Sequence, residues 1–179
     1  MSLRDHYLRT TYRVSGVTPA IDIRVGEPCP PLDALLDKHA ARSWAFITAW
    51  NPGSKKLEAD ENHRRQAALK AEVKQDGYVF YRGAGIPDDQ VEQSSGETDP
   101  DTLHRVGRSP ARTCAGTLFE TPAHSFHVPR SSLDSWEPEE SILILGIDSE
   151  DAVKLGKKYA QAAIVFGERN GLAQLVFNI

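Results

Sequence analysis

Apolar and polar residues recur with two different periods along this chain, and together they predict an α/β (α+β) fold. Short runs with a period of two, or of nearly continuous apolar residues, predict strands at 12–14, 20–25, 44–50, 78–81, 141–147, 163–167 and 174–177. Apolar residues three or four positions apart predict helices at 30–39, 60–73 and 149–159. We therefore expect one domain over residues 1–179, in two or three layers, with a mixed β-sheet, about three flanking helices and a β-hairpin at each terminus.

Local residue preferences set the expected ends of the helices. Pro30 is placed at a helix start, Asp60 is expected to cap the second helix, and Gly77 to end it. Ser149 is expected to cap the third helix. The dipeptide Asn170-Gly171 favours a tight turn between the last two strands.

Residues 93–135 break this regularity, because they are rich in Ser, Thr, Pro, Gly and charge and have no sustained period. Long irregular stretches of this kind are typically functional lids or insertions, so we expect an irregular insertion or lid here. The segment contains His104, Cys114, His124 and His127. Their spacing does not match that of structural zinc sites, so we interpret them as solvated loop residues and predict no metal site.

The charge and the hydropathy of the chain argue against nucleic acids and membranes as partners. The net charge of −4 argues against a dedicated nucleic-acid binder, since such affinity comes from clustered cations. The two cysteines, Cys29 and Cys114, lie far apart and form no CxxC pair. No apolar run approaches the roughly 20 residues that cross a bilayer, and the N-terminus has no hydrophobic signal region. We expect a cytoplasmic protein without a membrane partner.

A candidate ligand site follows the apolar strand 44–50. Asn51 and Ser54 lie directly after that strand, and the next helix places Asn62 and Arg65 on the inward face that Leu69 continues. The first turn of a helix favours an anion, and an arginine can bind phosphate or carboxylate bidentately. These residues predict binding of a small anionic metabolite such as a nucleotide or a sugar phosphate.

A structural interpretation carries about equal weight. Asn51 to Ser54 is also good turn chemistry, and Arg65 can form a partly buried ion pair with Glu140. If the protein is an enzyme, Glu140 is the candidate general base, with Glu61 as the other nearby carboxylate, and His63 is expected to be solvated. The chain has no P-loop, GxSxG or HExxH motif, so no reaction class or cofactor is predicted.

Several spaced blocks resemble a known family. They are the strand and turn Phe46–Ser54, then Asn62 and Arg65, then Glu140 leading into the strand at 142–147, then Gln161 before Ile164–Gly167. In this order they resemble the bacterial domain-of-unknown-function family 3293 over residues 7–92 and 136–177. The resemblance implies a small cytoplasmic α/β domain and no particular activity, and it adds Gln161 to the candidate ligand-binding residues.

This chain departs from that family's pattern in two places. The connection that contains residues 93–135 is much shorter in the family, which is why this segment looks like an insertion. The family favours Gly and Asn on either side of the glutamine, whereas this chain has Ala160 and Ala162.

Two other function classes stay open. A protein-interaction module would use the insertion, with Phe119, Phe126 and Trp136 as a docking surface. A nucleic-acid-associated accessory protein, against which the net negative charge argues, would use a basic strip in the same segment, formed by Arg105, Arg108, Arg112 and Arg130.

Overall fold

The computed structural model describes residues 2–87 and 139–178. The strands are β1 (Thr10–Ser15), β2 (Ile21–Ile23), β3 (Ser43–Thr48), β4 (Val79–Pro87), β5 (Glu139–Leu145), β6 (Ala163–Glu168) and β7 (Gln174–Phe177). The α-helices are α1 (Leu3–Leu8), α2 (Pro30–Lys38), α3 (Ala59–Gln75) and α5 (Ser149–Lys158), and a single 3₁₀ turn, η1, covers Pro52–Ser54. The predicted α+β class is confirmed, as are the three flanking helices α2, α3 and α5.

All seven strands form one sheet in the order β2-β1-β4-β5-β3-β6-β7. The predicted terminal hairpins are present as β1–β2 and β6–β7. The prediction of a mixed sheet is wrong, because every neighbouring pair is antiparallel. Strands joined by a helix do run in the same direction, but β5 lies between β3 and β4, and β3 lies between β5 and β6. This is the split β-α-β arrangement of ferredoxin-like domains, so no parallel pair forms.

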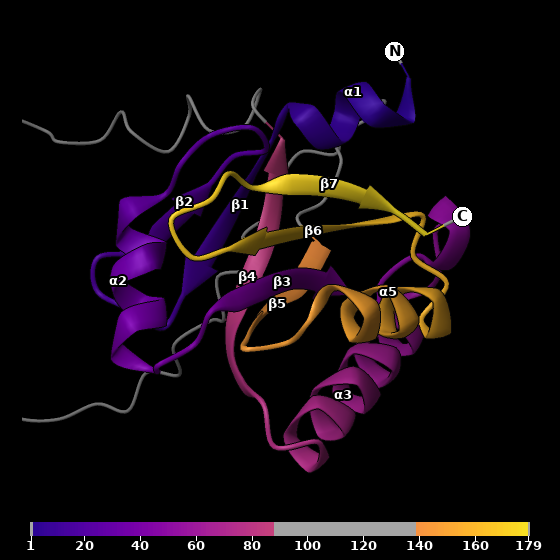
Figure 1. Cartoon of the computed structure of the whole chain (residues 1–179). Coiled ribbons are helices and arrows are strands. Elements are labelled where there is room, and N and C mark those ends of the chain that lie inside the picture. The colour runs from indigo at the N-terminus through magenta and orange to yellow at the C-terminus, as the bar shows by residue number, and fades with distance from the viewer. Residues whose placement is uncertain (1, 88–138, 179) are drawn as a thin grey trace, which may run out of the picture. The chain divides into compact units, whose positions relative to one another are not determined.

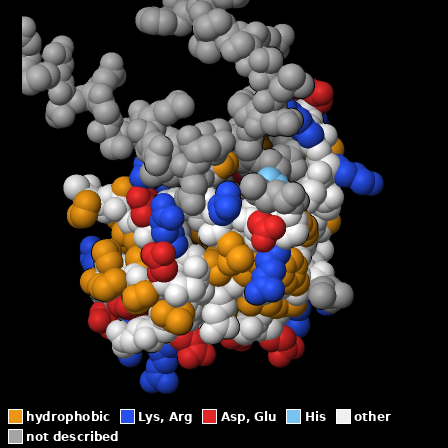
Figure 2. Space-filling model, turned by 90° about the horizontal axis from the view of Figure 1, so that it is seen from above, with side chains coloured by type: hydrophobic (Ala, Val, Ile, Leu, Met, Phe, Trp, Pro, Cys, Tyr) orange, Lys and Arg blue, Asp and Glu red, His pale blue; other side chains and the backbone are white. Residues whose placement is uncertain are grey.

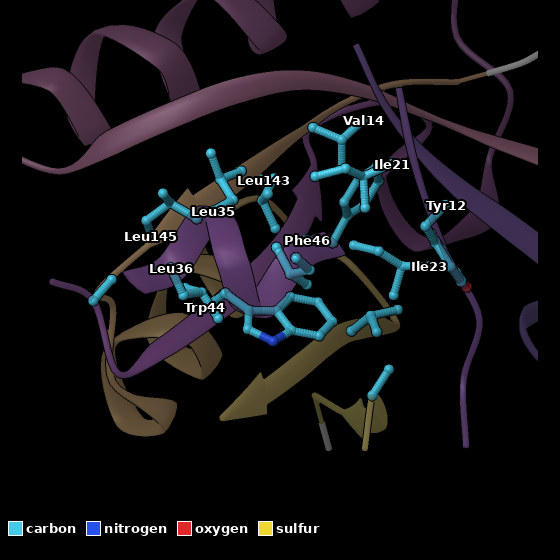
Figure 3. Close-up of a cluster of buried hydrophobic side chains, with 14 residues drawn as sticks. Tyr12, Val14, Ile21, Ile23, Leu35, Leu36, Trp44, Phe46, Leu143 and Leu145 are labelled. Atoms are coloured by element: carbon cyan, nitrogen blue, oxygen red, sulfur yellow. The ribbon is translucent and has the colours of Figure 1, made fainter. Parts of the chain in front are cut away.

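The sheet separates two hydrophobic cores. Figure 1 shows the helices that cover them, with α3 and α5 side by side and α2 apart from both. On one face α2 packs Leu32, Leu35 and Leu36 against a first cluster. Figure 3 shows this cluster around Trp44 and Phe46. On the other face α3 and α5 cover a second cluster that contains Leu69 and other strand and helix residues. Successive strand residues point to opposite faces, which explains why the nearly continuous apolar strands β3 and β5 serve both cores.

Helix starts differ from the predictions by one or two residues. The N-cap of α3 is Glu58 rather than Asp60, and its side chain makes no capping hydrogen bond. The N-cap of α5 is Asp148 rather than Ser149, and its carboxylate accepts a hydrogen bond from the backbone N–H of Asp151. Aspartate and serine are both good caps, so the sequence allows either position. The helix α1 was not predicted, because six residues give too little periodicity.

The antiparallel pairing of β3 and β5 brings the end of β3 and the start of β5 together, at the edge of the sheet where these two central strands end. Thr48, the last residue of β3, pairs with Ser141 near the start of β5. The chain that follows β3 therefore meets Glu139 and Glu140, although about 90 residues separate them in sequence. The candidate site lies at this edge.

Some sequence predictions fall outside the described residues. They concern the 93–135 insertion with Cys114, the histidines at 104, 124 and 127, the aromatic residues Phe119, Phe126 and Trp136, and the arginines at 105, 108, 112 and 130. Within residues 2–87 and 139–178, no helix is long and apolar enough to cross a membrane. In the same ranges no three His, Cys, Asp or Glu side chains are grouped as a metal site would require.

Candidate functional site

The turn after β3 has a backbone that few residue types adopt. Asn51 has φ 45° and ψ 60°, and Gly53 and Ser54 also have positive φ values of 60° and 59°. Asparagine and glycine tolerate this left-handed region best, which is the physical reason for the Asn-Pro-Gly sequence. The turn is held by a hydrogen bond from the Gly53 N–H to the Ala160 carbonyl at 2.7 Å. It therefore lies against the end of α5.

Asn62 fixes this turn to α3. The side chain is 2% exposed, and its Oδ1 accepts a hydrogen bond from the Asn51 N–H at 3.0 Å. Its Nδ2 donates to Asn51 Oδ1 at 3.0 Å and to the Leu57 carbonyl at 3.3 Å. The Leu57 N–H also donates to Asn51 Oδ1 at 3.0 Å. All of these contacts are internal, so Asn62 supports the turn, as the structural interpretation predicts.

Arg65 lies one turn further along α3 and is half-buried. Its Nε donates to the Ala49 carbonyl at 2.9 Å and its Nη2 to the Tyr159 carbonyl at 2.7 Å. Tyr159 is the C-cap of α5, so the guanidinium also lies at the negative end of that helix dipole. The predicted ion pair between Arg65 and Glu140 is not formed. Glu140 pairs with Lys70 instead, because Lys70 projects from α3 over the same face of β5.

Two glutamines complete the network. The Gln161 Nε2 donates to the Trp50 carbonyl at 2.8 Å, and the Gln66 Oε1 accepts from the Ala49 N–H at 2.9 Å. The Asn178 Nδ2 donates to the Gln161 carbonyl at 2.9 Å. Three buried polar atoms in the described part of the chain have no protein partner: Trp50 Nε1, Gln66 Nε2 and Asn178 Oδ1. All three belong to residues of this network, so its polar groups are incompletely paired by protein.

The structure therefore brings together Asn51, Asn62, Arg65 and Gln161, but it does not bring Ser54 into their network. Ser54 is exposed, at the outer side of the turn. Glu61 forms a surface ion pair with Arg64 at 3.1 Å. The exposed His63 packs its ring edge-on against Trp50, at 5.4 Å between centroids.

Glu139, rather than Glu140, is the carboxylate that contacts the turn. Its Oε1 accepts a hydrogen bond from Asn51 Nδ2 at 2.6 Å. Burial raises the pKa of the Glu139 carboxyl above its ordinary value, and the hydrogen bond from Asn51 opposes this shift in part. A carboxyl with this environment is the better candidate for proton transfer or ligand binding at this edge of the sheet.

Sequence reasoning missed Glu139 and Gln66, although the sequence carries a signal for each. Glu139 shares its face of β5 with Ser141, Leu143 and Leu145, so the period of two places it on the side of the first cluster. Gln66 lies three residues before Leu69, on the inward face of α3. Both residues are polar at positions where the pattern calls for apolar ones.

Comparison with known proteins gives a family and no activity. No curated protein and no solved structure matches this chain. The family model "Protein of unknown function (DUF3293)" matches residues 47–97 and 118–164, which is more than half of the chain. The match includes the last two residues of β3, the Asn51 turn, α3, β4, β5 and α5, and residues 98–117 fall between its two segments. The chain belongs to the DUF3293 family of proteins of unknown function.

Proposed function

We propose that this protein binds a small anionic ligand, such as a nucleotide or a sugar phosphate, beside the Asn51 turn. The observation that carries the proposal is that the Arg65 guanidinium is partly buried and has no carboxylate partner among the described residues. It is half-buried, two of its five N–H groups donate to carbonyls, and no carboxylate of the described residues lies within 4 Å of it. Within the described residues, three donors and the positive charge of this guanidinium therefore have no partner.

Two other charged side chains of α3 differ from Arg65, because each has a partner of opposite charge. On α3 itself, Lys70 is paired with Glu140, and Glu72 is paired with Lys158 at 2.6 Å. A charge that is partly removed from water is normally neutralised by a partner of opposite sign. In the part of the chain that the structure describes, the only partners of Arg65 are carbonyl oxygens, which carry partial charges.

The two carbonyl contacts serve the proposed role, because they hold the guanidinium in one orientation. A side chain that is already fixed loses less conformational entropy when a ligand binds. The dipole of α3 favours an anion at its N-terminus, although the first turn also carries the carboxylates of Asp60 and Glu61. Asn51, Asn62 and Gln161 keep the turn in place, and Ser54 can offer its exposed hydroxyl from the outer side.

A thermal-shift experiment tests this proposal. The probes are inorganic phosphate, a nucleoside monophosphate and a sugar phosphate, added to the wild type, Arg65→Gln and Arg64→Gln. A probe at a hundred times its Kd stabilises the native state by about 2.7 kcal/mol, which raises the Tm by roughly 5–10 °C for a chain of this size. We expect this rise for the wild type and for Arg64→Gln, and its loss in Arg65→Gln.

Arg64 is the matched control because it is the neighbouring arginine on the same helix, is exposed and is paired with Glu61. Titration calorimetry of the same three proteins separates lost binding from lost stability. If no probe binds the wild type, or if Arg65→Gln binds as tightly as the wild type, the proposal fails.

The other predicted function classes gain less support. In the face that Figure 2 shows, Lys and Arg side chains are interspersed with Asp and Glu, without the single-sign surface that a nucleic-acid binder needs. The proposed docking surface at 93–135 lies outside the described residues. A cytoplasmic location is part of this proposal, and the free thiol of Cys29 is compatible with it.

A further inference from the structure

The strand β7 lies at one end of the sheet, and its composition is unusual for an edge strand. Its hydrogen-bonded neighbour is β6, and Figure 1 shows β7 in yellow beyond that strand. Residues 170–178, which include the whole of β7, contain no charged side chain and no proline. Phe177 is 38% exposed, and Leu172 just before the strand is 50% exposed. Edge strands are normally protected from pairing with another chain by charges or prolines, and β7 has neither.

The opposite edge strand, β2, carries the protection that β7 lacks. Its central residue, Asp22, is exposed and forms an ion pair with Arg13 of β1 at 2.7 Å. Pro19 lies two residues before the start of β2. A charge in the middle of a strand and a proline next to it both oppose the addition of a further strand. The two edges of this sheet therefore differ, and β7 is the one whose side chains allow the sheet to be extended.

The hydrogen bonds of β7 show which of its backbone groups point away from β6. The Asn178 N–H donates to the Ala162 carbonyl at 2.9 Å, so the even-numbered residues of β7 direct their N–H and C=O groups toward β6. The odd-numbered residues point outward, and Ala173 agrees with this, because its N–H and C=O bond to the loop before α2. Leu175 and Phe177 follow in this series. Within residues 2–87 and 139–178, no backbone hydrogen bond involves their outward groups.

These outward groups are complementary to a second copy of themselves. If a second β7 lies antiparallel beside the first, around a twofold axis at Val176, Leu175 of each strand faces Phe177 of the other. Each facing pair exchanges two backbone hydrogen bonds, so every outward N–H and C=O of Leu175 and Phe177 is paired. The facing side chains are Leu with Phe and Val with Val, and apolar pairs of this kind stabilise antiparallel strands.

We propose that β7 is the surface through which two copies of this chain associate, as an antiparallel β7–β7 pair centred on Val176. A contact around a twofold axis meets its own copy, so an uncharged strand brings no like charges together. The pairing ends before Ala173, whose outward groups are already bonded to the loop before α2. The paired segment is short, so we expect a weak dimer whose population depends on protein concentration.

Analytical ultracentrifugation over a range of protein concentrations tests for this dimer. The wild type is expected to change from monomer to dimer as the concentration rises. Phe177→Lys places a charge on the paired segment and is expected to weaken association about tenfold or more. Leu172→Lys is the matched control, because it places the same charge on a more exposed apolar residue outside that segment, and it is expected to change association by about a factor of two or less.

Disulfide trapping tests the register of the pair. At its centre the two Val176 residues face each other without exchanging backbone hydrogen bonds, and their Cα atoms are expected about 4.5 Å apart, which a disulfide can span. Val176→Cys, combined with Cys29→Ser and Cys114→Ser, is expected to form a covalent dimer in oxidised glutathione. Leu172→Cys in the same background is expected to stay monomeric. Circular dichroism of each variant shows whether it is folded.

Three results would overturn the β7 pairing. They are a wild type that stays monomeric at every concentration, equal association of Phe177→Lys and Leu172→Lys, and cross-linking of Val176→Cys that is no faster than that of Leu172→Cys. All of these experiments measure association between copies of the chain. They are therefore independent of whether a phosphate binds at Arg65.

Discussion

Replacing Asn62 with alanine tests how the Asn51 turn is held. The variant removes three hydrogen bonds: one accepted from the Asn51 N–H, one donated to Asn51 Oδ1 and one donated to the Leu57 carbonyl. Asn51 Oδ1 keeps the Leu57 N–H as a donor, but the Asn51 N–H loses the partner it has in this structure. The site is 2% exposed, so water cannot easily replace the lost amide.

The expected loss follows from these contacts. A typical intramolecular hydrogen bond contributes about 1 kcal/mol, and a buried group left unpaired costs about 1–3 kcal/mol. We therefore expect Asn62→Ala to lower the free energy of unfolding by about 2–4 kcal/mol, and the Tm by roughly 4–15 °C.

Urea denaturation followed by circular dichroism measures this change. The transition midpoint should fall while the slope with urea stays constant, since the same surface is exposed on unfolding. Glu61→Ala is the control on the adjacent residue, where an exposed ion pair with Arg64 contributes at most about 1 kcal/mol. A loss below about 1 kcal/mol for Asn62→Ala, or one equal to that of Glu61→Ala, would refute the assignment of Asn62 as the residue that holds the turn.

Two further predictions concern packing and pH. A methyl group at Gly83 would lie 2.5 Å from the Phe46 ring, so Gly83→Ala should lower the free energy of unfolding by about 1–3 kcal/mol. A methyl group at Gly85 would lie 3.3 Å from Thr10, so Gly85→Ala should lower it by less. Urea denaturation of both variants compares the two losses. Equal losses would contradict this packing. Because burial raises the pKa of Glu139 in the folded state, this carboxyl stabilises the fold when protonated, and that stability is lost as pH rises from its ordinary pKa through the raised value. Glu139→Gln should therefore gain stability relative to the wild type between acid and neutral pH, measured as unfolding free energy at several pH values; an unchanged difference would count against the raised pKa.

Local patterns along the sequence predict much of this fold. The period of two and the continuous apolar runs locate the strands, and the helical period places Asn62 and Arg65 on the inward face of α3. Both residues do face the Asn51 turn, as expected. These features depend on neighbours a few residues apart, so a single sequence carries them.

Long-range pairing is what the sequence leaves open. Whether β5 inserts between β3 and β4 depends on contacts between residues about 90 positions apart, and no local period encodes that order. The same limit explains the choice of Glu140 over Glu139, because the face of β5 that meets Asn51 is known only once the register is known. The partners of Arg65 could not be predicted for the same reason, since Ala49 and Tyr159 lie far from each other in the sequence.

The most direct test of the central claim is a titration of isotope-labelled protein with a nucleoside monophosphate, followed by proton–nitrogen NMR. The proposed site predicts that the Arg65 Nε–H signal and the amide signals of residues 49–56 shift and saturate together. It also predicts that these shifts are absent in Arg65→Gln and present in Arg64→Gln. Saturating shifts confined to other parts of the chain, or no shifts for any of the three phosphate probes, would contradict an anion site at the Asn51 turn.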